Sequence, residues 1–134
     1  MSFRRIVLAV VVCMWLSSVV RSEDWPSWRG PNRDDISTET GLLKAWPEGG
    51  PEKLWTSKEA GLGYSGLSVA RGVLFTMGAD GTTEESNEFV IALNAESGEK
   101  IWQTNVGNYL DNGWGGGPRS TPTVSGDLLV AISG

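Results

Sequence analysis

Few residues of this 134-residue chain have side chains suited to catalysis. The chain contains no histidine, and its one cysteine, Cys13, lies in an apolar stretch near the amino terminus. A Ser/His/Asp or Cys/His site needs an imidazole as general base, and histidine is also the commonest zinc ligand. The composition excludes those sites and predicts neither a catalytic residue nor a metal ligand set.

Two polar segments remain as candidates for ligand chemistry. Residues 113–121 (GWGGGPRST) are rich in glycine, but they lack the Gly-Lys-Ser/Thr ending and the following helix of a phosphate-binding loop. We interpret them as a long connecting loop. Residues 80–85 (DGTTEE) are acidic, but their spacing does not fit a calcium-binding loop, so a solvated turn is favoured.

The elements that would position these segments are extended. Residues 89–93 are a run of β-formers, and a second extended run begins at Lys100 and contains Trp102. Between them lie Asn94, Ser97 and Gly98, which are typical turn residues, so we predict a β-hairpin with a loop of about five residues. By the same pattern strands are expected at 53–57, 66–70, 73–78, 88–94, 100–105, 120–124 and 128–133.

An internal repeat runs through these strands. Residues 65–69 align with residues 120–124, and residues 73–77 align with residues 128–132, both at an offset of 55. Short strands between glycine-rich turns, repeated at such a period, are typical of β-propellers and related arrays.

The hairpin also resembles a known family. Ala92, Asn94, Gly98 and Trp102 resemble the tryptophan-docking signature of pyrroloquinoline quinone (PQQ)-repeat β-propellers, with Asn94 in place of the usual Asp. In that family the tryptophan packs between adjacent blades, and the alanine and glycine keep that space open. The resemblance implies the same docking role for Trp102 and for Trp55 of the preceding strand.

This resemblance implies an all-β fold, a partial β-propeller spanning residues 53–134. One complete four-stranded blade would cover residues 66–105, with parts of two others at residues 53–57 and 120–133. Because each blade buries its faces against its neighbours, we interpret the sequence as the N-terminal fragment of a longer propeller. Its expected partners are the remaining blades.

Two classes of function are compatible with this family. The first is a non-catalytic binding or scaffold module, and the second is the N-terminal part of a PQQ-dependent alcohol or polyvinyl-alcohol dehydrogenase. The second would bind PQQ and Ca²⁺ in a full-length parent, whereas no cofactor is expected in this fragment. Arg119 lies in a Gly-Pro-Arg-Ser-Thr-Pro run that the family shares, so it would face the central channel and an anionic group, or pair with a loop carboxylate such as Asp111. Tyr64 is the other cofactor-binding candidate, at the mouth of the channel.

Residues 1–22 read as a secretory signal peptide. Arg4 and Arg5 precede an apolar run of eleven residues, which is shorter than the roughly twenty needed to span a bilayer. This pattern favours the general secretory route over a twin-arginine signal, and bulky Val12 before Cys13 argues against a lipoprotein. We predict cleavage before Glu23 and a periplasmic or extracellular location.

Residues 23–52 form an N-terminal arm without sustained periodicity. Its residues 25–34 are similar to the N-terminal signature of secreted PQQ-repeat proteins of planctomycete-like bacteria. We favour an arm pinned across the propeller by aromatic burial over a ligand platform of Trp25, Trp28 and Arg29. Residues 41–46 fit a helical turn or an extended connector equally well.

The mature chain would be acidic. Cleavage would remove three of the eleven basic residues, which leaves eight against sixteen acidic ones and a net charge near −8. Nucleic-acid binding needs clustered lysine and arginine, so it is not expected.

Overall fold

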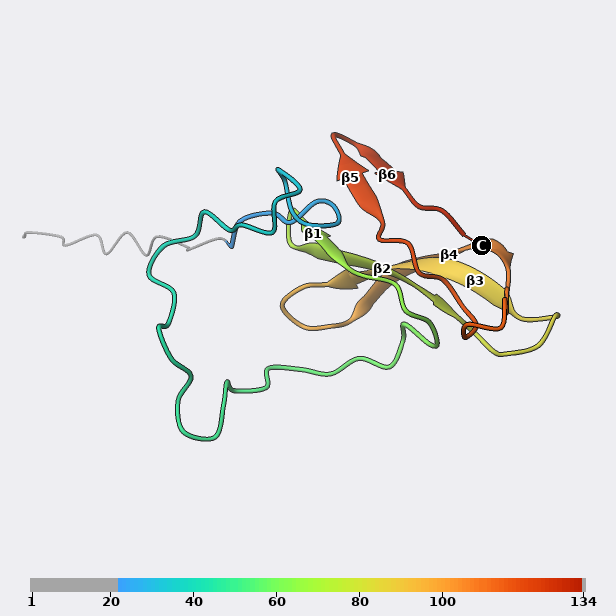
Figure 1. The fold of residues 1–134 in the computed structure, drawn as a ribbon, viewed down its shortest axis with the longest axis horizontal. Coiled ribbons are helices and arrows are strands. Elements are labelled where there is room, and N and C mark those ends of the chain that lie inside the picture. Colours follow the sequence, from blue (N-terminus) through green and yellow to red (C-terminus); the bar gives the residue numbers. More distant parts are fainter. Residues whose placement is uncertain (1–21, 134) are drawn as a thin grey trace, which may run out of the picture.

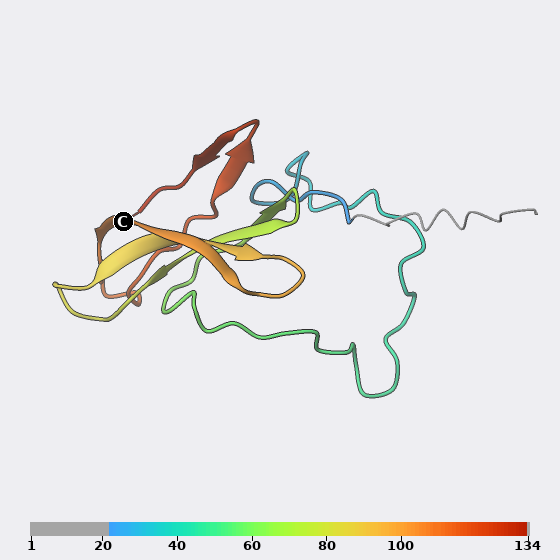
Figure 2. The same cartoon turned by 180° about the vertical axis from the view of Figure 1, so that it is seen from behind.

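The computed structural model describes residues 22–133, and the predicted signal peptide therefore lies almost wholly outside the described residues (Figures 1 and 2). This part of the chain is all-β and contains no helix, hence no helix that could cross a membrane. Its strands are β1 (Ser68–Ala70), β2 (Val73–Ala79), β3 (Asn87–Asn94), β4 (Lys100–Asn108), β5 (Thr123–Ser125) and β6 (Leu128–Val130).

The strands form two antiparallel sheets. The larger has the order β1-β2-β3-β4, and the smaller is the β5–β6 hairpin, which stands off from the large sheet in Figure 1. β3 is the central element, since residues 89–93 are buried on both faces. Phe89, Ile91 and Leu93 alternate along β3 and pack with Leu74 into the core cluster, as period-2 side chains of one sheet face must.

The β3–β4 hairpin confirms the predicted connection of residues 95–99. Gly98 has a φ of 73°, the left-handed region that glycine enters without steric cost. The Asn94 Oδ1 accepts backbone N–H bonds from Glu96 (2.8 Å) and Ser97 (3.0 Å). An asparagine therefore makes the two turn bonds that an aspartate would make at this position.

Positions related by the offset of 55 lie against one another. The Ser65 hydroxyl donates to the backbone carbonyl of Ser120 at 2.6 Å, and the Arg71 guanidinium donates to the Gly126 carbonyl at 3.0 Å. The β1–β2 and β5–β6 hairpins are thus neighbours at equivalent positions, and β1 contacts β5 directly. The repeat that the sequence predicts is also a spatial repeat.

The start of the N-terminal arm joins the two sheets. Trp25 exchanges two backbone hydrogen bonds with Val69 of β1 (2.7 and 2.8 Å), and the Pro26 carbonyl accepts the N–H of Val124 in β5 (2.7 Å). The arm is therefore held here by backbone pairing, while the half-buried Trp25 indole lies against Gly30 within the arm itself. The Trp28 side chain is 64% exposed. Beyond this contact the chain runs in a wide open loop before it returns to β1 (Figures 1 and 2).

Several predicted boundaries were wrong. Residues 53–57 form no strand, because no other segment of the described residues offers them a ladder of hydrogen bonds; Trp55 is the residue of this run that bonds to distant chain there. The strands expected at 66–70 and 128–133 are shortened to β1 and β6. The strand expected at 120–124 is shorter and displaced, since β5 begins at Thr123 and ends at Ser125, and β4 extends to Asn108. Residues 41–46 are irregular and contain no helical turn, so of the two interpretations the connector is the one that remains.

Candidate functional site

Of the predicted docking residues, Trp55, Asn94 and Gly98 come together at the β3–β4 turn, whereas Ala92 and Trp102 do not. The Trp55 indole lies over Gly98, where a side-chain Cβ would stand 2.5 Å from its Cε3 and 2.7 Å from its Cδ2. The Trp55 Nε1–H donates to the Ala95 carbonyl at 3.1 Å. The turn thus presents a flat surface without a side chain and one acceptor at its rim, so it recognises both the face and the polar edge of an indole.

Trp102 occupies a different environment on β4. It is the register partner of Ala92, which is fully buried, and its ring centroid lies 6.0 Å from that of Phe75 at an interplanar angle of 45°. The Trp102 side chain remains 38% exposed. It lines an apolar groove of about 320 Å³ together with Val90, Thr104, Val106, Leu129 and Ala131. The groove separates β3 and β4 from β6 and its continuation.

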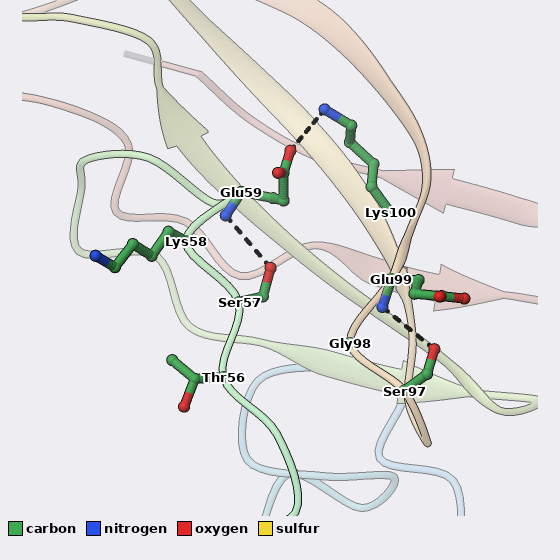
Figure 3. Close-up of a pocket in the computed structure, with 8 residues that line it drawn as sticks. All are labelled: Thr56, Ser57, Lys58, Glu59, Ser97, Gly98, Glu99 and Lys100. Carbon is green, nitrogen blue, oxygen red and sulfur yellow. Dashed lines mark hydrogen bonds and ion pairs between the residues drawn. The ribbon is translucent and has the colours of Figure 1, made fainter.

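A polar recess of about 470 Å³ lies beside the docked Trp55 (Figure 3). Glu59 and Lys100 form an ion pair across it at 2.7 Å, with both side chains about half exposed. The two walls have short polar runs, residues 56–59 and residues 97–100. This recess could not be predicted from the sequence, since residues 60–96 separate the two runs and nothing in either run marks them as neighbours.

Arg119 and Tyr64, the two cofactor-binding candidates, contact each other. The Arg119 Cζ lies 5.0 Å from the centroid of the Tyr64 ring, a cation–π arrangement. The guanidinium also donates to the carbonyls of Trp114 (2.9 Å), Gly115 (2.6 Å) and Gly117 (3.4 Å). Arg119 therefore holds its own glycine-rich loop in place.

Asp111, the alternative partner predicted for Arg119, forms a hydrogen bond within its own loop instead. The Asp111 Oδ1 accepts the backbone N–H of Gly113 at 2.9 Å, and within residues 22–133 no ion pair joins it to Arg119. Backbone carbonyls take the place of that carboxylate, because the loop folds back over the guanidinium.

Acidic side chains are scattered in the described part of the chain. No group of three or more His, Cys, Asp or Glu side chains there is placed to hold a metal ion. In the 80–85 turn, the Asp80 Oδ1 accepts the N–H of Asn87 at 2.7 Å and so closes the β2–β3 connection. Glu88 is buried, and its Oε1 accepts the N–H of Leu110 at 3.4 Å; sequence reasoning placed this residue at a strand start and missed its burial.

The arrangement is suited to holding chain segments together: an indole platform, an apolar groove and an anchored loop. No protein-family model, curated protein or solved structure matches this chain.

Proposed function

We propose that this chain is part of an exported β-propeller of the PQQ-repeat type, and that it acts as a non-catalytic binding or scaffold module. In this proposal β1–β4 are one blade, β5–β6 begin the next, and Trp55 is the docking residue contributed by the blade before. The proposal rests on one observation: the Trp55 indole packs on Gly98 and donates a hydrogen bond to the Ala95 carbonyl.

The contacts between repeat positions support this arrangement. When identical units are rotated about a common axis, equivalent residues lie closest together near the axis and diverge toward the rim. Ser65 and Ser120 are equivalent and hydrogen-bonded, and both precede the first strand of their sheets. β1 and β5 would then be the innermost strands, and β4 the outermost strand of its blade.

The chemistry of the described residues favours a scaffold over a catalyst. The guanidinium of Arg119 is committed to three loop carbonyls and to the Tyr64 ring, which makes both residues structural in this proposal. The groove beside Trp102 is apolar and lies between the sheets, so it suits the packing of further chain. The partners proposed are the remaining blades, and no nucleic acid.

An activity assay tests this proposal against the dehydrogenase alternative. The purified chain, supplied with PQQ and Ca²⁺, is offered primary alcohols and polyvinyl alcohol with an artificial electron-accepting dye. We expect no dye reduction above that of a sample from which PQQ is omitted. PQQ-dependent turnover would refute the non-catalytic role and favour a dehydrogenase.

A further inference from the structure

Glu23 makes a two-way contact with residues 38–39 of the arm. Its backbone nitrogen donates to the Glu39 Oε1 at 2.6 Å. In return, its own Oε2 accepts the Thr38 backbone N–H (3.2 Å) and the Thr38 hydroxyl (2.8 Å). A short N–H bond to a carboxylate is of the charge-assisted kind, about twice as strong as a bond between neutral groups.

The long-range hydrogen bonds of the described chain begin at this residue. Asp24 accepts the backbone N–H of Arg71 at 2.9 Å, and Trp25 pairs with β1. The hydroxyl of Ser22, by contrast, reaches only the carbonyl of its neighbour Glu23. Within residues 22–133, hydrogen bonds to distant chain are therefore present directly after the bond that the sequence predicts to be cleaved.

We propose that hydrolysis of the Ser22–Glu23 bond creates a new α-ammonium group on Glu23, and that the Glu39 carboxylate binds it. The inference rests on the proposed export of the chain. Water adds across the peptide bond: the C–N bond breaks, Ser22 keeps the new carboxylate, and the Glu23 nitrogen takes up protons to become –NH₃⁺.

Cleavage changes the donor at this contact without moving it. Before hydrolysis the Glu23 nitrogen is a neutral amide with one hydrogen to donate, and afterwards it is a cation with three. The partner is an anion in both states, so the attraction increases on processing. Glu39 thereby fastens the mature amino terminus to the arm, close to where the arm joins β1 and β5.

Export followed by chemical labelling tests the inference. The full chain is secreted from a bacterial host, and its first residue is identified by amino-terminal sequencing. The mature chain is then treated near neutral pH with limiting acetic anhydride, and acetylation of the α-amine is followed by mass spectrometry. Because the carboxylate favours the unreactive ammonium form, Glu39→Gln should acetylate about threefold to tenfold faster than the unsubstituted chain.

Matched controls separate the possible outcomes. Glu48 lies on the same arm, exposed and outside the hydrogen bonds and ion pairs of the described residues, so Glu48→Gln should leave the α-amine rate unchanged. The exposed Lys44 ε-amine should label equally in all variants. A first residue other than Glu23, or equal α-amine rates in Glu39→Gln and Glu48→Gln, would overturn the inference. A chain that keeps its leader in the cell would instead refute export.

Discussion

Gly98→Ala should displace the Trp55 indole and loosen the β3–β4 turn by about 3 kcal/mol. The new Cβ would stand 2.5 Å from the indole Cε3, a distance that real contacts do not reach, and the three nearest atoms all belong to the rigid Trp55 ring. A φ of 73° adds left-handed strain of about 1–2 kcal/mol for any residue with a Cβ. The turn cannot relieve both the steric clash and the backbone strain unless the Trp55 indole moves away.

Amide hydrogen exchange measures this effect locally. The N–H groups of Gly98 and Asn94 are bonded to the carbonyls of Asn94 and Glu99 and report opening of the turn. Gly72→Ala is the matched control, since Gly72 has a φ of 78° in another hairpin turn but open space around its Cβ position. Gly72→Ala should therefore introduce the left-handed backbone strain without any steric clash. If Gly98→Ala and Gly72→Ala lose equal protection, each at its own turn, the indole contact contributes nothing to the stability of the β3–β4 turn.

Ile91→Ala should cost about 3 kcal/mol, as usual for truncation of a fully buried aliphatic side chain. Ile91 is 0% exposed at the centre of β3 and packs with Phe89 and Leu93. The amides of β2 and β3 should then exchange roughly a hundredfold faster, because 1.4 kcal/mol corresponds to a factor of about ten.

Ile101→Ala is the control for that experiment. Ile101 is 53% exposed and is the extra residue of a β-bulge on β4, opposite the register shift between Ala92 and Leu93. Truncation of this side chain should change the free energy of opening, as measured by amide exchange, by no more than about 0.5 kcal/mol. A similar effect of the two substitutions would mean that β3 does not hold the core.

The parts of the fold that were predictable are those encoded locally. The run of β-formers at 89–93 and the turn residues Asn94 and Gly98 specify the hairpin without help from distant chain, and the structure confirms it. The offset of 55 was equally visible, because strand and turn residues recur in the same order. The contact of Trp55 with Gly98 was implied only by the family resemblance, in which the glycine of this turn leaves room for a docking indole.

The remaining features depend on contacts that no local pattern encodes. Residues 53–57 are strand-forming types, but they have no partner strand among the described residues. A β-strand depends more on hydrogen bonds to a neighbouring strand than on the β-propensity of its own residues. Arg119 could have met a carboxylate or an anion; only the path of its loop brings three carbonyls to it. The pairing of Trp25 with β1 depends likewise on how the arm returns to the sheet.

Calorimetry of the purified, monomeric chain tests the central claim most directly: these sheets are repeat units that depend on neighbouring units for burial. Trp102 is 38% exposed, and β4 pairs on one side only. We therefore expect a broad heat absorption whose calorimetric and van't Hoff enthalpies disagree. A single steep two-state transition of the monomer, with the two enthalpies equal, would contradict the claim and identify the chain as a self-sufficient domain.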